Sequence, residues 1–368
     1  MSRLDELIEE LCPDGVLHTA LEKVCIIGKG VQFNKSDMKN QGSYPVINGG
    51  INPSGYIELY NQEADTITIS QGGASAGYVN WQQTKFWAGA HCYVLSPKKG
   101  LDNRYLFHFI KSMEYKLQEC QYGAGIPALA KKTVAALIIP VPPLPVQEEI
   151  VRILDTFTVL TAELTAELTA RKKQYEYYRN KLLLFGDNVE DVSRLPLKEI
   201  ADLFRGEYIT KQSTQEGNIP VILGGQEPAY YINKSNHNGE IVVVARSGAS
   251  AGYVSYWNEP IYVTDGFGYG AKQDNVLPKY LYYVLKNMET ELNGMKRGAG
   301  VPHVSGEALS TIKLPIPSIA EQKRIVNILD RFDALCNDIS TGLPAEIEAR
   351  KKQYEYYRDK LLTFKELA

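Results

Sequence analysis

The chain has 368 residues, too many for one ordinary hydrophobic core and about right for two domains of roughly 100–200 residues. Its 44% hydrophobic and 23% charged residues are typical of a folded protein and exclude a disordered or fibrous one. With 40 Lys and Arg against 43 Asp and Glu the net charge is -3, so binding to a polyanion needs a locally basic surface.

The N-terminal segment and the cysteines predict neither a membrane segment nor a metal site. Residues 2–11 are rich in acids and have the spacing of a short amphipathic helix, not the cationic start and apolar core of a signal peptide. No apolar run approaches about 18 residues, the length of a spanning helix. The five cysteines form no CxxC pair and no metal-ligand spacing with a histidine, so we expect reduced thiols in a cytoplasmic protein.

The second half of the chain repeats the first. The segment RKKQYEYYRNKLLLF at 171–185 returns at 350–364 with changes only at Asn180 and Leu184. GASAGYV occurs at 73–79 and again, unchanged, at 248–254. Because this period is far longer than that of a solenoid repeat, we interpret the chain as a duplicated unit, each copy made of a globular domain followed by a helix.

Each repeat begins with a mixed α/β domain. Short strand-like runs are separated by glycine-rich turns, and one predicted helix interrupts them. A proline-rich joint then ends the domain. The corresponding segments are 65–69 and 240–244 for two of the strands, 103–120 and 278–293 for the helices, and 139–143 and 314–317 for the joints.

After each joint the apolar residues change to heptad spacing, which predicts a long spacer helix. The first seam runs from Ile150 to Phe185, and the second contains two successive steps of four next to Gly342, where we expect a kink or break. Since such seams must be buried, we expect an antiparallel coiled coil with the two domains at opposite ends, related by pseudo-twofold symmetry. The predicted parts are a first domain at 1–147, a spacer helix at 148–186, a second domain at 187–319 and a second spacer helix at 320–368.

Motifs for catalysis are not found. Asn52-Pro53-Ser54-Gly55 lacks the second proline of an amino-methyltransferase loop, and Gly28-Lys29-Gly30 lacks the spacing of a phosphate-binding loop. Asp102 and Glu114 could suggest a metal nuclease, but their place in a predicted helix favours charge pairing on its surface. The five histidines do not correspond between the repeats. We therefore predict a chain with no catalytic residues, metal or cofactor of its own.

The glycine-rich turns bring together side chains that can contact base edges and phosphates. Amides, hydroxyls, aromatic rings and cations all occur in them. The candidate DNA-binding residues are Gln32, Asn34, Lys35, Gln71, Ser75, Tyr78, Arg205, Tyr208, Lys211, Arg246, Ser247, Ser250, Tyr253, Lys296 and Arg297.

The layout resembles the specificity (S) subunit of type I restriction-modification systems. The resemblance rests on the pattern I-V-x-I-L-D-x-F at 150–157 and 325–332, which opens each spacer helix, and on RKKQYEYYR, which closes it. It implies two target-recognition domains that each read one half-site of a bipartite double-stranded DNA target. It also implies two methyltransferase (M) subunits, which supply S-adenosylmethionine and methylate adenine, and restriction (R) subunits, which use ATP and Mg for translocation and cleavage.

Two features of the spacer helices bear on this interpretation. Thr161-Ala162-Glu163-Leu164 is repeated at 165–168, and the resemblance suggests that the number of such units sets the half-site spacing. One unit lengthens a helix by about 6 Å, close to two base pairs at roughly 3.4 Å each. Tyr177 and Tyr356 point off the seam and are candidates for binding the M subunits, whereas Tyr175, Tyr178, Tyr354 and Tyr357 are expected in the core.

Two alternatives stay open. The chain could be a protein-interaction adaptor or decoy that binds M subunits without productive DNA recognition. An autonomous methyltransferase or nuclease is the third hypothesis.

Overall fold

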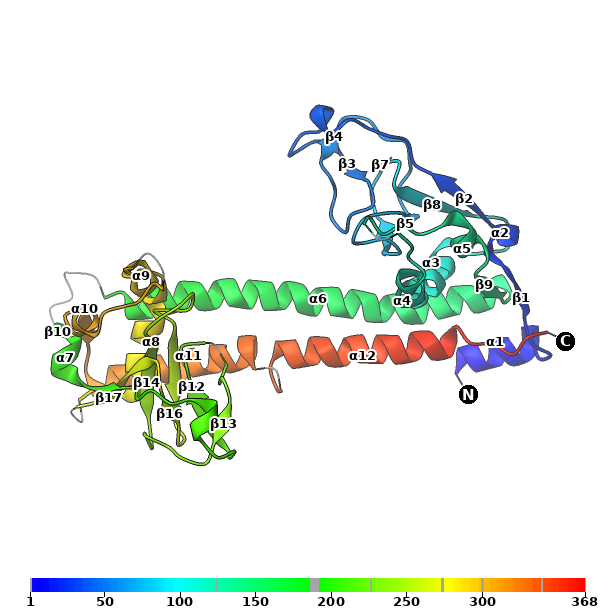
Figure 1. Cartoon of the computed structure of the whole chain (residues 1–368). Helices are drawn as coiled ribbons and strands as arrows, with labels where there is room; N and C mark the ends of the chain where they lie inside the picture. The colour runs from blue at the N-terminus through cyan, green and yellow to red at the C-terminus, as the bar shows by residue number, and fades with distance from the viewer. Residues whose placement is uncertain are drawn as a thin grey trace. The chain divides into compact units, whose positions relative to one another are not determined.

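The computed structural model describes residues 2–123, 125–185, 192–225, 227–272, 275–298, 301–338 and 340–367. The chain forms two compact units. Unit 1 consists of Met1–Thr165 and Glu346–Ala368, and unit 2 of Ala166–Ala345. The C-terminal helix therefore belongs to the same unit as the N-terminal domain (Figure 1).

Apart from α1, which precedes β1 in unit 1, the described residues of the two units form the same elements in the same order. Unit 1 has α1 (Arg3–Leu11), β1 (Leu17–Ala20), α2 (Leu21–Val24), β2 (Cys25–Lys29), η1 (Lys35–Asp37), β3 (Tyr44–Ile47), β4 (Tyr56–Ile57), β5 (Thr66–Ser70), β6 (Val79–Gln82), β7 (Trp87–Ala88), β8 (Cys92–Pro97), α3 (Asn103–Ser112), α4 (Glu114–Glu119), α5 (Lys131–Ala135) and β9 (Ile138–Val141). Unit 2 has β10 (Ser193–Pro196), α7 (Leu197–Ile200), β11 (Ala201–Arg205), η2 (Lys211–Ser213), β12 (Ile219–Ile222), β13 (Tyr231–Ile232), β14 (Ile241–Ala245), β15 (Val254–Trp257), β16 (Tyr262–Val263), β17 (Gly266–Ala271), α8 (Pro278–Asn287), α9 (Glu289–Gly294), α10 (Gly306–Ser310) and β18 (Lys313–Ile316). The spacer helices are α6 (Leu144–Leu183), α11 (Ile319–Asn337) and α12 (Leu343–Leu361).

Each unit contains a four-stranded antiparallel sheet, a three-stranded sheet and a separate strand pair. The order is β2-β8-β5-β6, β4-β3-β7 and β1-β9 in unit 1, and β11-β17-β14-β15, β13-β12-β16 and β10-β18 in unit 2. Only β3-β7 and β12-β16 pair in parallel among the described strands. The prediction of a mixed α/β fold, built twice, is confirmed.

Strand β14, in the centre of the larger sheet of unit 2, is apolar along its whole length because both faces of the sheet are covered. On β14, Val242 and Val244 pack in the core beneath α8, while Ile241 and Val243 belong to a second cluster on the opposite face. Cys92 and Tyr93 of β8 divide between two clusters in the same way. The duplicated sequence therefore builds the same two-sided core twice.

The prediction of one helix in each domain is wrong in detail. The segment forms two helices that meet at a sharp turn. In unit 1 the turn is at Met113, whose N–H bonds the carbonyls of Phe109 and Ile110 at 3.3 and 3.1 Å. In unit 2 it is at Met288. The turn allows Leu117 to reach the core.

The spacer helices behave as their spacing predicts. Helix α6 is continuous over 40 residues, whereas the second spacer is divided into α11 and α12. The expected break at the four-residue stutter is confirmed. A Cβ on Gly342 would lie 2.5 Å from the carbonyl oxygen of Ala334, so this close approach requires glycine. No helix in the described parts of the chain is long and apolar enough to cross a membrane.

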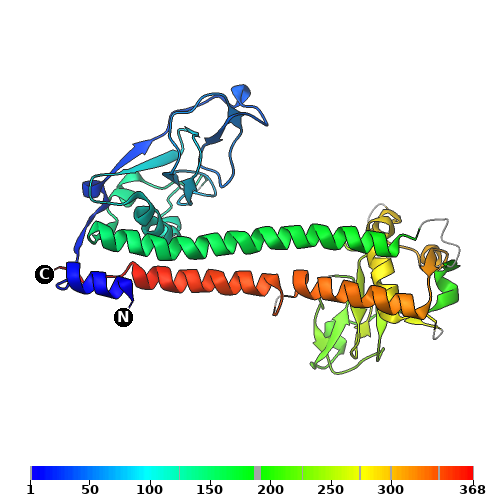
Figure 2. The ribbon, with the colours of Figure 1, turned by 180° about the vertical axis from the view of Figure 1, so that it is seen from behind.

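Within each unit, two spacer helices pack side by side and run antiparallel (Figures 1 and 2). In unit 1, Phe157 of α6 stacks on Tyr357 of α12 with ring centroids 5.4 Å apart. In unit 2, Tyr178 of α6 stacks on Phe332 of α11 at 5.8 Å. Tyr178 and Tyr357, which we expected in the core, contact the partner helix with one face and remain 37% and 38% exposed.

Candidate nucleic-acid interface

In each unit the two repeated glycine-rich loops meet at one end of the four-stranded sheet. The first loop follows β5 or β14, and the second follows α4 or α9. In unit 1, the N–H of Gly73 donates to the carbonyl of Pro127 at 2.9 Å. In unit 2, Gly248 donates to Pro302 at 3.0 Å. The two motifs are about 50 residues apart in the sequence, but the fold brings them together. They thus form one surface of loops.

The first loop owes its shape to glycine. Gly73 and Gly248 have φ angles of 82° and 80°, which residues with a Cβ rarely adopt. At Gly77 and Gly252, a Cβ would lie 2.9 and 2.7 Å from the backbone of the following helix. The repeated GASAGYV motif is therefore explained by backbone conformation and close packing.

A third segment, just before β8 or β17, joins these loops. The N–H of Gln71 donates to the carbonyl of His91 at 2.8 Å, and the N–H of Arg246 donates to Asp265 at 3.2 Å. His91 and Asp265 therefore hold equivalent places in the two units. Sequence reasoning missed both, although each directly precedes a buried strand that pairs with the motif-bearing strand.

Tyr78 and Tyr253 are held by the same arrangement in both units. The Lys111 ammonium lies 4.6 Å from the centroid of the Tyr78 ring and 2.5 Å from the Glu114 carboxylate. That carboxylate also accepts the N–H of Val79 at 2.7 Å. Burial, followed by the charge of Glu114, raises the pKa of Tyr78. Glu114 thus forms the charge pair expected of it, with Lys111, and is in addition part of a clamp on the loop.

Unit 2 repeats this clamp with its own residues. The Lys286 ammonium lies 4.1 Å from the centroid of the Tyr253 ring and 2.8 Å from Glu289, which accepts the N–H of Val254 at 2.7 Å. The clamp is the same in the two units, so it holds the loop in the same way in both.

The remaining candidates in the loop clusters are three serines, Lys296 and Arg297. Ser75, Ser247 and Ser250 are half-buried. Lys296 donates from Nζ to the carbonyl of Ala249 at 2.7 Å, so its ammonium ties the two loops together. Arg297 is exposed and pairs through its backbone with His303, another residue that sequence reasoning missed.

A second group of candidates lies on the segment after the edge strand. Gln32, Asn34 and Lys35 follow β2 and are exposed. In unit 2, Arg205 is the last residue of β11, and Tyr208 and Lys211 follow it; all three are exposed, Tyr208 to 86%. Backbone hydrogen bonds from Val31 to Ala88 and from Glu207 to Val263 fix these segments along β7 and β16.

The two loop clusters differ most in charge. In unit 2 they carry Arg246, Lys296 and Arg297, and the equivalent places in unit 1 hold Gln71, Gln121 and Tyr122. Among the described loop residues, three cations of unit 2 therefore stand where unit 1 has neutral side chains.

Tyr177 and Tyr356 lie outside both loop clusters, on the spacer helices. Their side chains are 60% and 62% exposed. Each ring meets the next tyrosine edge-on, with centroid distances of 5.4 and 5.3 Å. Both rings are thus held in place and open to contact from outside.

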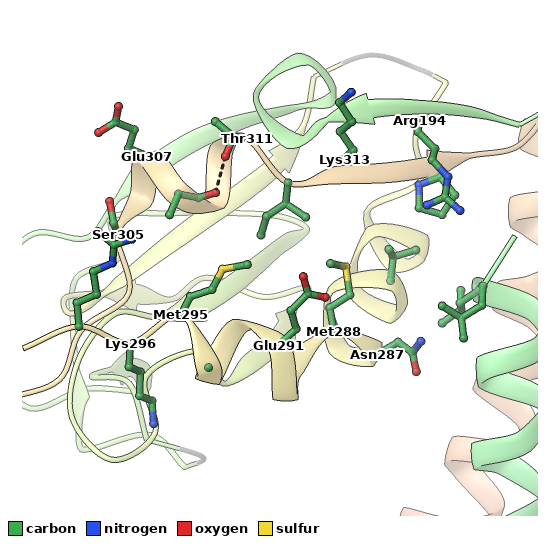
Figure 3. A pocket seen from close by; sticks show the side chains of 18 residues that line it. Arg194, Asn287, Met288, Glu291, Met295, Lys296, Ser305, Glu307, Thr311 and Lys313 are labelled. Carbon is green, nitrogen blue, oxygen red and sulfur yellow. Dashed lines mark hydrogen bonds between the residues drawn. The ribbon is translucent and has the colours of Figure 1, made fainter. Parts of the chain in front are cut away.

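A hollow of about 990 Å³ lies between α8, α9, α10 and the end of α6 in unit 2, and Lys296 and Arg297 of the loop cluster form part of its wall (Figure 3). Its wall carries cations and acids together, including Arg194, Glu291, Glu307 and Lys313. A hollow of about 500 Å³ lined by the equivalent elements occurs in unit 1. Among the described residues, no group of three or more His, Cys, Asp and Glu could hold a metal ion.

Comparison with known proteins identifies the family. The chain matches the model of the type I restriction modification DNA specificity domain twice, at residues 13–171 and 190–349. It is 35% identical over 367 residues to a putative type I restriction enzyme specificity subunit of Haemophilus influenzae, covering 90% of each chain. It is 37% identical over 244 residues to the EcoR124I/EcoR124II specificity subunit of Escherichia coli, covering 60% of each chain.

The fold has a solved counterpart as well. The crystal structure of the S subunit from M. genitalium aligns with a TM-score of 0.72 at 20% identity, covering 94% of this chain and 96% of that one. This likeness concerns the fold. The two matches to the family model and the relative from Haemophilus influenzae show that the chain belongs to the family of type I restriction-modification DNA specificity subunits.

Proposed function

We propose that the chain reads a two-part DNA sequence, with one half-site contacted by the loop cluster of each unit. The observation that carries this proposal is that two loop clusters of the same construction present different side chains at equivalent places, such as Gln71 in unit 1 and Arg246 in unit 2. One scaffold with two sets of side chains is suited to recognising two different short sequences. The other candidate residues on these loops would position the DNA backbone.

We further propose that the chain has no catalytic role. The polar groups of the loop clusters are held by backbone and side-chain partners in a pattern suited to contact, and the Tyr354–His108–Asp155 network of unit 1 is buried between helices, away from these loops. S-adenosylmethionine, ATP and Mg would then belong to partner subunits. Since its target is cellular DNA, the chain would act in the cytoplasm.

The partners would be two M subunits and the R subunits. The duplicated spacer helices offer two similar surfaces, each with an exposed tyrosine, Tyr177 or Tyr356. Exposed aromatic rings held by a neighbouring ring are typical anchors of protein interfaces. Two equal surfaces favour two copies of one partner.

Methylation-aware sequencing tests this proposal. DNA from cells carrying this gene and its neighbouring M gene is compared with DNA from cells that lack only this gene. We expect a gapped two-part motif with modified adenine that disappears on deletion. A soluble complex with M but no gapped motif would instead support the adaptor or decoy function.

A further inference from the structure

The internal repeat shows which positions can distinguish the two half-sites. Residues that are identical in both loop clusters, such as Tyr78 and Tyr253, cannot do so. Arg246 and its equivalent Gln71 differ, and both stand at the end of the central strand, where the three loops meet. Their backbones are fixed in the same way, because the N–H of each donates a hydrogen bond to the carbonyl of the residue just before β8 or β17.

Arg246 sits in a rigid and open position. Its carbonyl accepts the N–H of Val304 at 2.9 Å, so hydrogen bonds hold its backbone on both sides. Its side chain is 41% exposed, and its Nη1 lies 3.9 Å from Oδ1 of Asp265. The other carboxylate oxygen of Asp265 accepts a hydrogen bond from the hydroxyl of Ser247. Asp265 is therefore fixed at ion-pair distance from the guanidinium, which keeps its N–H donors for a ligand.

The equivalent side chain in unit 1 is directed inward. The Gln71 side chain lies next to the Tyr93 hydroxyl, and its Oε1 is buried without a hydrogen-bond partner. The place of Tyr93 is taken in unit 2 by Phe267, since Tyr93 pairs with Ile69 and Phe267 with Val244 at matching positions of the two sheets. Phe267 has no hydroxyl that could hold a polar side chain in the core. Unit 2, which lacks the tyrosine hydroxyl, is therefore the unit that carries the pair of Arg246 and Asp265.

We propose that Arg246, positioned by Asp265, recognises the guanine of one G·C pair in the half-site contacted by unit 2. This inference rests on the proposed function of the loop clusters. A guanidinium can donate two hydrogen bonds to O6 and N7 of guanine, the commonest specific contact in the major groove. Phosphate binding fits less well, because a carboxylate next to the guanidinium cancels the positive charge that attracts phosphate. Asp265 is a positioning residue in this arrangement.

The test uses the full chain in complex with its M subunits and duplexes that carry its motif. Each guanine of the motif is replaced, one at a time, by 7-deazaguanine, which lacks the N7 acceptor. With the wild-type chain, we expect one replacement in one half-site to weaken binding about tenfold, because it removes one of the two acceptors of the bidentate contact. In the R246Q variant, the same replacement should cause no further loss of binding affinity. In the D265N variant, it should cause a loss that is smaller than in the wild type.

R324Q is the matched control, since Arg324 on α11 is paired with Glu321 at 2.7 Å and lies outside the loop cluster. It should keep the full sensitivity to 7-deazaguanine. The inference is overturned if no guanine is sensitive in the wild-type complex, or if R246Q remains as sensitive as the wild type. The wild-type measurement stands even if R246Q fails to fold.

Sequencing of methylated DNA separates failure of this inference from failure of the proposed function. In R246Q cells we expect one G·C position of one half-site to become degenerate, with the other half-site and the spacer unchanged. An unchanged motif with uniformly weaker methylation would assign Arg246 to phosphate and overturn the inference. Absence of a gapped motif in wild-type cells would overturn the proposed function itself.

Discussion

The imidazole Nε2 of His108 lies 2.9 Å from Oδ1 of Asp155, a contact that fastens α3 to α6 inside unit 1. The other ring nitrogen, Nδ1, lies 3.0 Å from the hydroxyl of Tyr354 on α12. His108 is completely buried, so one histidine connects the globular domain to both spacer helices of its unit. The network is satisfied when a neutral ring donates from Nε2 to Asp155 and accepts at Nδ1 from Tyr354.

Unit 2 builds the same junction without a histidine. Tyr283 of α8 donates its hydroxyl to Asp330 of α11. The two units therefore share a polar link between domain and helix, but only the link in unit 1 can gain a proton near neutral pH.

We predict that this difference makes unit 1 sensitive to mild acid. Burial lowers the pKa of His108 below its usual 6.5, helped by Arg104 and Arg358, while Asp155 opposes the shift. The unfolded histidine binds a proton more readily than the folded one, so stability is complete above about pH 6.5 and declines as the pH falls below it. Asp155 has a lowered pKa, since its bonds to His108 and Arg104 outweigh burial, and affects stability only near and below pH 4.

Thermal unfolding between pH 7.5 and about 5 measures the effect of His108. The H108Y variant copies the side chain of Tyr283 and should flatten the decline of the melting temperature in this range. An equal decline in the wild type and in H108Y would show that His108 is not its cause.

We predict that G342A destabilises the turn between α11 and α12. The added Cβ would lie 2.5 to 2.9 Å from three backbone oxygens, which cannot move without disturbing the end of α11. The expected loss in unfolding free energy is about 1–3 kcal/mol, the usual cost of overpacking. Urea unfolding checks it against G294A, where a Cβ meets no atom within 4 Å and stability should not fall. Equal stability of the two variants would contradict the account of the turn.

The TAEL units of α6 give a prediction about DNA spacing. A third unit inserted after Leu168 should lengthen the spacer of the methylated motif, since it adds about 6 Å of helix, and should leave both half-sites unchanged. A control variant in which 165–168 are replaced by four other helix-forming residues should keep the original spacer. An altered half-site in the insertion variant would refute the ruler interpretation.

The exposed tyrosines predict where the M subunits bind. Alanine at both Tyr177 and Tyr356 should strongly reduce co-purification with M, because each ring is exposed and held against its neighbour. The double variant Y115A/Y208A removes two tyrosines that are 73% and 86% exposed on the globular domains and should leave co-purification unchanged. Wild-type recovery of M with the first variant would remove these residues from the interface.

Long periodic patterns made much of this fold predictable from sequence. The heptad seam predicts α6, and the stutter at Gly342 predicts the break in the second spacer, because both depend on neighbouring residues along one helix. The candidate site was predictable only in part. The repeat marked the loop of Arg246, but Asp265 reaches it only through the pairing of β14 with β17, which no local pattern reveals. The role of Glu114 was missed for the same reason, since its partner Val79 lies on another element.

The central claim is that each globular domain reads its own half-site, and exchanging one domain for the other tests it most directly. Residues 21–135 would be replaced by 197–310, a segment with equivalent ends in helices α2 and α5 or α7 and α10. The methylated motif of cells carrying this chain with its M gene should then contain two copies of the half-site read by unit 2 and keep its spacer. A motif that retains the first half-site would contradict the claim.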